Sequence, residues 1–369
     1  MIVPPSDTVP TIHVRGHILL DDEREVGDLW VRGGRVSLTR PSAQGAGLRV
    51  LEGWAVPGLV DAHCHIGLGA EGPVSREIAE RQAVADRDSG VLAIRDAGSP
   101  SDTRWMSSRA DLPRLVRAGR HLALRARYLR NFGLELDDAA GLPAAVREQA
   151  RRGDGWVKLV GDWIDRSAGD LTPLWPADVL QDAVAQAHAE AARVTVHTFA
   201  TETVDALLDA GVDGIEHGTG MTADQIGRAA AAGVPVTPTL LQVERFAAIA
   251  DQAAEKFPAY AARMRRMHAR RYEQVRDLYD AGVRLLVGTD AGGTIGHGLI
   301  AGECAELVAA GIPAAEVVAF ASWRARSYLG LGAVVEGSSA DLVVYPDDPR
   351  ENIEVLRYPR AVVLRGEVH

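Results

Sequence analysis

The chain has 369 residues, and its 40 Lys and Arg against 50 Asp and Glu give a formal net charge of −10. That balance argues against a nucleic-acid-binding face, which needs a basic stripe, and against docking on an anionic membrane. With 47% hydrophobic residues the chain has ample material for a folded core, so intrinsic disorder is excluded as well.

No targeting or membrane-spanning segment is expected. The longest stretch without a charged residue, 229–243, contains two prolines and is shorter than the roughly 20 apolar residues that span a bilayer. Residues 1–7 have neither the basic start nor the apolar core of a signal peptide. The two cysteines, Cys64 and Cys304, are too few for a disulfide framework. We therefore expect a cytoplasmic protein that acts on a small molecule, as a monomer or a homo-oligomer.

The two ends of the chain have the pattern of antiparallel strands. Residues 11–20, 27–40 and 48–51 alternate between apolar and polar residues, with a turn at Gly33-Gly34. Two similar runs, 341–345 and 360–365, lie near the C-terminus. Neither end has enough apolar surface to fold alone. We expect residues 1–55 and 333–369 to pair into one small β domain.

The middle of the chain alternates between strand-like and helix-like segments. Runs rich in Val, Ile and Leu centre near residues 59, 92, 124, 158, 196, 215, 236 and 286. Stretches with apolar residues at helical spacing separate them. Strands this apolar, each followed by a helix, predict a parallel sheet covered by helices. Eight of them within residues 56–332 predict a closed (β/α)8 barrel, which typically takes about 250 residues.

A charged, helical stretch, 243–282, separates the last two predicted strands. We predict helices that cover the barrel here. A solvated helix pair and a lid or oligomer contact over the barrel mouth are both compatible with the sequence.

The first predicted barrel strand ends with two histidines, His63 and His65. Side chains alternate along a strand, so both rings share one face while Cys64 points into the helix layer. The carboxyl ends of barrel strands form the mouth, where active sites lie. Two imidazoles held together there are half of a metal site.

Three more residues of types that bind metals lie at the ends of other predicted strands. His197, His217 and Asp290 end the fifth, sixth and eighth strands, and therefore face the same mouth. Lys158 lies inside the fourth strand, where an unpaired ammonium is costly to bury. It pairs with a buried carboxylate such as Asp96, forms a Schiff base with a substrate, or becomes an anion that joins the site.

The combined pattern resembles the amidohydrolase superfamily, in particular its branch with imidazolonepropionase and the Xaa-Pro dipeptidases (prolidases). The residues that carry the resemblance are His63, His65, Lys158, His197, His217 and Asp290. The segments 56–65, 194–218 and 287–298 and the tail 335–344 are also similar, so the resemblance covers almost the whole chain.

The resemblance implies a distorted (β/α)8 barrel with a β-sandwich formed by both termini. It implies a binuclear centre, most simply two Zn²⁺ with Mn²⁺ or Co²⁺ as the other candidates, bridged by carboxylated Lys158. His63, His65 and Asp290 would hold one ion, and His197 and His217 the other. One departure concerns residues 128–133, which read Tyr-Leu-Arg-Asn-Phe-Gly where the peptidases commonly have Gly-Gly-His. This departure puts a peptide substrate in doubt.

Such a site predicts hydrolysis of an amide C–N bond by hydroxide formed at the metal, with Asp290 as general base and then general acid. The expected substrate is a small molecule such as a dipeptide, an N-acyl amino acid, an aryl amide or a cyclic amide. The alternatives are a deaminase or a lactone or ester hydrolase on the same metal site, a Schiff-base lysine enzyme, and a non-catalytic binding protein.

Four further residues receive secondary roles. His297, after the eighth strand, is a second catalytic candidate that hydrogen-bonds the substrate. Tyr128 and Asn131, after the third strand, are candidates for substrate contact. Asp96 is expected to cap a helix or to support a ligand histidine from behind.

Overall fold

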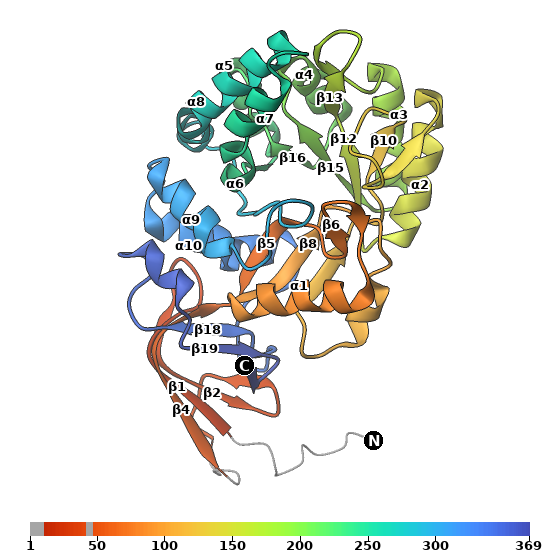
Figure 1. Cartoon of the computed structure of the whole chain (residues 1–369). Helices are drawn as coiled ribbons and strands as arrows, with labels where there is room; N and C mark the ends of the chain where they lie inside the picture. The colour runs from red at the N-terminus through yellow and green to blue at the C-terminus, as the bar shows by residue number, and fades with distance from the viewer. Residues whose placement is uncertain (1–10, 42–46) are drawn as a thin grey trace.

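The structure is a computed structural model that describes residues 11–41 and 47–369. It has a large α/β part and, at one end, a sheet built from both terminal regions (Figure 1). Residues 1–10 and 42–46 of the predicted N-terminal segment lie outside the described residues. Within the described part of the chain, no helix combines the length and apolar character that a membrane crossing requires.

The terminal sheet joins the two ends of the chain. Its strands are β1 (Thr11–Leu19), β2 (Glu25–Arg32), β3 (Arg35–Ser37), β4 (Leu48–Pro57), β18 (Leu342–Tyr345), β19 (Ala361–Leu364) and β20 (Glu367–Val368). Their order is β20-β19-β18-β4-β1-β2-β3, with β4 antiparallel to β18. The predicted pairing of the two termini is therefore present. The described strands form one seven-stranded sheet, and the two-sheet sandwich that the resemblance implied is not seen.

Strand β18 shows how this sheet is attached to the rest of the molecule. Leu342 and Val344 point into a core that belongs to the terminal sheet, whereas Val343 and Tyr345 point into the core of the α/β part. This is the two-residue period of a strand that is buried on both faces. The sheet also curls, because Ala340 N donates to Gly34 O at 3.0 Å and brings β3 back towards β18.

Glycine allows β4 to lie very close to its neighbours. Gly53 has a φ of 145°, and a Cβ atom built on it would collide with the carbonyl oxygen of Tyr345. Because this conformation and this approach both exclude a side chain, residue 53 has to be glycine.

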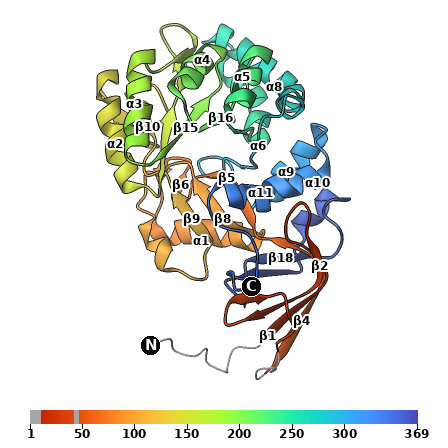
Figure 2. The ribbon, with the colours of Figure 1, turned by 180° about the vertical axis from the view of Figure 1, so that it is seen from behind.

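The α/β part contains two parallel sheets. The first consists of β5 (Leu59–Cys64), β8 (Val91–Asp96) and β9 (Arg114–Arg117). The second, in the order β11-β10-β12-β15-β16-β17, consists of β10 (Leu122–Leu124), β11 (Leu134–Leu136), β12 (Trp156–Val160), β15 (Arg193–Thr198), β16 (Gly214–His217) and β17 (Val236–Thr237). Helices α1 (Arg76–Asp88), α2 (Leu142–Arg152), α3 (Ala177–Ala189), α4 (Thr201–Ala210) and α5 (Ala223–Ala232) lie outside the strands (Figures 1 and 2).

The two sheets meet on one side through the predicted eighth strand. Leu286 N donates to Val236 O at 3.0 Å, and Ala62 N donates to Val287 O at 2.8 Å. The segment around Leu286 thus bridges β17 and β5 by isolated backbone bonds and is not itself a strand.

On the other side the third predicted strand is bent. Its first half, β9, pairs with β8, and its second half, β10, pairs with β12. Gly119, with a φ of 73°, lies between the halves. Among the described residues no strand pairing joins β9 to β10, so the structure shows a mixed α/β fold in which closure of the predicted eight-stranded barrel is not detected.

The predicted helices over residues 243–282 are present. They are α7 (Phe246–Ala253) and α8 (Pro258–Asp280), preceded by α6 (Leu240–Glu244). Phe246 and Met264 pack in one apolar cluster with Phe199, which directly follows β15. The helix pair therefore contacts the end of the strands that carries the predicted site residues.

The remaining elements connect or flank these. They are β6 (Leu68–Gly69), β7 (Gly72–Pro73), β13 (Asp162–Asp165), β14 (Asp170–Pro173), α9 (Ile300–Ala309), α10 (Ala314–Ala321), α11 (Trp323–Tyr328) and the 3-10 helices η1 (Arg104–Ser108), η2 (Ala139–Gly141) and η3 (Ile353–Arg357).

Candidate functional site

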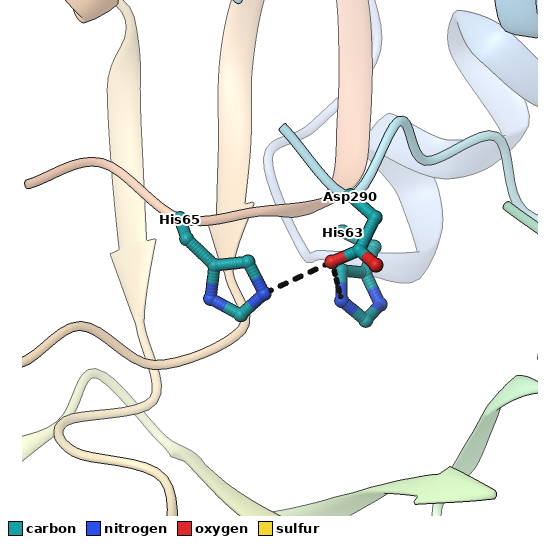
Figure 3. Close-up of side chains that lie close together, drawn as sticks. All are labelled: His63, His65 and Asp290. Carbon is teal, nitrogen blue, oxygen red and sulfur yellow. Dashed lines mark hydrogen bonds and ion pairs between the residues drawn. The ribbon is translucent and has the colours of Figure 1, made fainter. Parts of the chain in front are cut away.

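The end of β5 places His63 and His65 against Asp290 (Figure 3). Asp290 Oδ1 lies 2.9 Å from His63 Nε2 and 3.2 Å from His65 Nε2. The two imidazoles are 1% and 6% exposed, and their ring centroids are 5.2 Å apart. Both contacts use the same carboxylate oxygen, which leaves Asp290 Oδ2 free of either ring.

A buried carboxylate fixes this arrangement. Asp61 accepts hydrogen bonds from His63 N at 3.1 Å, Thr289 N at 3.1 Å and Thr289 Oγ1 at 2.5 Å. Asp61 thus ties the residue before Asp290 to the strand that carries the histidines. Although burial raises it, the pKa of Asp290 is held well below its usual range by His63 and His65, so the group is a carboxylate.

His197 and His217 come from the ends of the neighbouring strands β15 and β16. His217 Nε2 lies 2.9 Å from His197 Nδ1, and His217 Nδ1 lies 2.6 Å from Thr239 Oγ1. The ring centroids of His63 and His217 are 5.2 Å apart, so both histidine pairs belong to one cluster. Burial lowers the pKa of His217 to about 3, which keeps the imidazole neutral.

Two nitrogens of this cluster have no hydrogen-bond partner among the described residues. His197 Nε2 and His63 Nδ1 are both buried, and His63 Nδ1 lies 3.5 Å from Glu216 Oε1. Buried polar atoms are nearly always satisfied, so an orphaned imidazole nitrogen beside three other histidines indicates a missing ligand.

Lys158 is buried beneath the cluster and donates to Glu216, not to Asp96 as one prediction had it. Glu216 also accepts hydrogen bonds from Arg95 Nη2 at 3.3 Å and from Thr195 Oγ1 at 2.9 Å. Burial lowers the pKa of Lys158 to about 7. Sequence reasoning missed Glu216, although its position directly before His217 in an apolar strand was a usable signal.

Asp96 takes the second of its two predicted roles. Its Oδ1 accepts a hydrogen bond from Gly98 N at 2.8 Å, and Gly98 O lies 2.6 Å from His65 Nδ1. Asp96 therefore supports the backbone group that orients His65.

A further histidine, His121, also lies next to the cluster. It is 1% exposed, and its ring centroid is 6.0 Å from that of His65. Neither of its ring nitrogens has a hydrogen-bond partner among the described residues. Nothing in the local sequence distinguished this residue, because it does not end a predicted strand.

The structure places the secondary candidates in different surroundings. Tyr128 lines the cavity at the cluster. His297 instead lies 2.9 Å from Asp86 Oδ2 of helix α1, with its Nδ1 3.7 Å from Cys64 Sγ. Asn131 is exposed. Neither His297 nor Asn131 is among the residues that line the cavity, so a substrate contact by either residue stays a prediction.

The cavity beside Asp290 has a volume of about 80 Å³. Its lining residues are His65, Leu68, Tyr128, Leu129, Phe132, Trp163, His197, Gln242, Asp290, Gly292, Gly293 and Thr294. A larger cavity of about 630 Å³, beside the arginine-rich segment 117–120, contains none of the clustered residues.

The cluster fits a divalent metal ion. Two sets of ligand atoms, one from His63, His65 and Asp290 and one from His63, Glu216 and His217, each lie within 4.8 Å of one another. Neutral imidazoles with carboxylates are the donor set that Zn²⁺ and similar ions prefer in proteins.

Comparisons with known proteins agree with this picture. The model of the amidohydrolase family matches residues 54–368. An uncharacterized protein of Mycobacterium tuberculosis is 50% identical over 364 residues, which cover 99% of this chain and 97% of that protein.

Two solved structures have the same fold. A Xaa-Pro dipeptidase with bound methionine in the active site has a TM-score of 0.82 at 21% identity, with 97% of this chain and 99% of that chain covered. The ochratoxinase of A. niger has a TM-score of 0.78 at 18% identity, with 97% and 95% covered.

Proposed function

The chain belongs to the amidohydrolase family, and from that premise we propose that it is a metal-dependent hydrolase that cleaves an amide C–N bond of a small molecule. One observation carries the proposal: four buried histidines and the Asp290 carboxylate converge at one cavity. A Xaa-Pro dipeptidase, by its name, cleaves a peptide C–N bond, and this supports the same bond class here.

In this proposal His63, His65 and Asp290 would hold one divalent ion, and His197 and His217 would hold a second. Lys158, whose amine would react with CO2 to form a carbamate and release a proton, would supply a further anionic ligand. Zn²⁺ is the first candidate because imidazole and carboxylate ligands suit it, and Mn²⁺ and Co²⁺ follow. Glu216 then keeps Arg95 and Thr195 as its partners.

When bound, the metal supplies Lewis acidity and lowers the pKa of a water molecule towards 7. Asp290 takes the proton of the attacking water, because its low pKa keeps it ionised and its Oδ2 is free of both histidines. It then gives this proton to the departing nitrogen, which an amide needs because an amine anion is a poor leaving group.

The Schiff-base alternative is disfavoured by the position of Lys158. Its amine points at Glu216, and Lys158 is not among the residues that line the cavity. Deamination and the opening of a lactone or ester use the same groups as amide hydrolysis, so the substrate panel has to separate them.

The test compares metal-loaded, chelated and remetallated protein on N-acyl amino acids, dipeptides, aryl amides and lactones. We expect amide turnover that disappears with the chelator and returns with Zn²⁺. Turnover that survives complete removal of the metal would contradict the proposal. Borohydride trapping of a substrate on Lys158 would replace it with the Schiff-base mechanism.

A further inference from the structure

The cavity beside Asp290 has no lysine or arginine among its described lining residues. We infer, on the basis of the proposed function, that the enzyme takes an uncharged substrate with a small aromatic or apolar group next to the scissile bond. A dipeptide or N-acyl amino acid with a free carboxylate would be a poor substrate.

One wall of the cavity is aromatic. The ring centroids of Tyr128 and Trp163 are 4.7 Å apart in an edge-to-face arrangement. The ring of His197 lies 5.4 Å from Trp163 and 5.8 Å from Tyr128, so this wall leads directly to the cluster. Flat apolar surfaces of this kind bind planar groups by burial and stacking.

The rest of the lining is apolar or neutral. Leu68 is buried, and Leu129 is 43% exposed, although large apolar side chains are usually covered. A Cβ atom on Gly293 would lie 3.2 Å from the Phe132 ring, so glycine keeps this side of the cavity open. Gln242 and Thr294 provide hydrogen bonds without charge.

Two nearby arginines are directed elsewhere. Arg127 donates to Trp163 O at 3.2 Å and to Thr172 Oγ1 at 2.7 Å, and it lies 3.4 Å from Asp165. Its guanidinium thus supports the loop behind the aromatic wall. Arg245 is exposed and donates to Thr294 O at 3.3 Å, outside the cavity lining.

Asp290 is the only Asp, Glu, Lys or Arg side chain among the described lining residues, and in the proposed function it is a metal ligand. A substrate carboxylate that lies against the aromatic wall, away from the histidine cluster, would lose water and find no Lys or Arg side chain there. A site that leaves a polar group unpaired discriminates strongly against it. A neutral aryl or apolar group loses little in the same position.

The experiment uses matched pairs that differ only in the carboxylate, with the metal-loaded full-length protein. Acetanilide is compared with 4-acetamidobenzoate, and N-acetylphenylalaninamide with N-acetylphenylalanine. The ratio of kcat to KM is measured where there is turnover, and Kd is measured by calorimetry for every compound. We expect the neutral member to be preferred by at least about tenfold.

The outcomes separate this inference from the proposed function. A preference for the charged member, equal treatment of both members, or binding of neither overturns the inference. If the neutral members bind more tightly but no amide is hydrolysed, the inference stands and amide hydrolysis by this site is contradicted.

Substitutions test which side chains cause the preference for the neutral member of each pair. Trp163→Ala is expected to weaken binding of the aryl member by about tenfold, because stacking and burial are lost. Trp163→Phe is expected to restore most of that binding. Arg245→Ala is the matched control and is expected to leave the preference unchanged. If Arg245→Ala instead removes binding of the carboxylate members, this arginine is their receptor and the inference fails.

Discussion

Two regions of this molecule use buried strand positions in opposite ways. In the terminal sheet most buried positions are apolar, as at Leu29 and Leu342. At the carboxyl ends of the central strands they carry charge, as at Lys158, Glu216 and Arg95. Burying charge costs stability unless every charge has a partner, so the second arrangement persists only where it serves a function.

Histidine makes the contrast sharpest. His13 and His17 of the terminal sheet stack on Trp30 and Trp54, with ring centroids 4.8 and 3.9 Å apart. His63 in the cluster is buried and lies 2.9 Å from a carboxylate. The same residue type thus covers apolar surface in one region and presents a lone pair in the other. The two kinds of histidine differ in position, because His63 lies at the end of a strand whereas His13 and His17 lie inside one.

The largest effect is expected from Asp290→Asn. The amide still occupies the same space but cannot take a proton, so kcat should fall by about 10²- to 10⁴-fold. Kinetics on the best amide and metal analysis of the same sample check this. Asp28→Asn, which removes the acceptor 2.6 Å from His13 in the terminal sheet, is the control and should leave kcat unchanged. Equal kcat in the two variants would remove Asp290 from the chemistry.

The next largest effect is a loss of stability, which is expected when the buried ion pair between Lys158 and Glu216 is broken. In the metal-free protein Lys158→Met leaves the buried Glu216 with one cation fewer, and the free energy of unfolding should fall by about 3–5 kcal/mol. Urea unfolding measures this. Arg15→Met removes a pair whose side chains are 60% and 58% exposed, and it should cost only about 0–1 kcal/mol. Similar losses for both variants would contradict the contrast between the regions.

The α/β part should also respond to pH through Glu303, which accepts hydrogen bonds from Leu240 N and Leu241 N. Burial raises the pKa of Glu303 to about 8 from its ordinary 4.5. Between these values the folded protein binds a proton that the unfolded chain has released, so stability falls as pH rises, by at most about 1.4 kcal/mol per pH unit.

Glu303→Gln should make that slope shallower in urea unfolding between pH 5 and 9. Asp61, Asp96 and Asp162, whose pKa values burial raises to about 7, contribute to the rest of the slope. Glu25→Gln, at a partly exposed position of the terminal sheet, is the control and should keep the slope. A slope that is identical in the wild type and in Glu303→Gln would assign the pH dependence to another group.

The smallest effect is expected in the sheet and concerns stability alone. Gly53→Ala places a methyl group against the carbonyl of Tyr345 at a positive φ, which should cost about 1–3 kcal/mol. Gly27→Ala is the matched control, because its nearest contact would be at 3.9 Å. Thermal unfolding and kcat are measured together. A loss of kcat in the folded Gly53→Ala variant would show that the sheet takes part in the activity.

The sequence was informative wherever a local pattern determines the structure. Alternation along a strand predicted that His63 and His65 share a face, and they do. The alternating runs at both ends predicted one composite sheet, and β4 pairs with β18. Both follow from the two-residue period of a strand, which can be read without knowing its neighbours.

Long-range relations could not be read in this way. The partner of Lys158 is set by which residue of β16 points to the same side of the sheet as Lys158, across the intervening strand β15, and it is Glu216. His297 turns to Asp86 because helix α1 offers a carboxylate there. The bend at Gly119, which divides the third strand between two sheets, looks in sequence like any other turn.

The central claim is that the clustered histidines hold the metal that hydrolysis needs, and metal content tests it most directly. Plasma mass spectrometry on purified full-length protein should find roughly two divalent ions per chain. The count should drop in His63→Asn and stay unchanged in His188→Asn, an exposed histidine that lies 2.8 Å from Asp213. A metal-free active enzyme, or a His63→Asn variant with the same metal content as the wild type, would contradict the account.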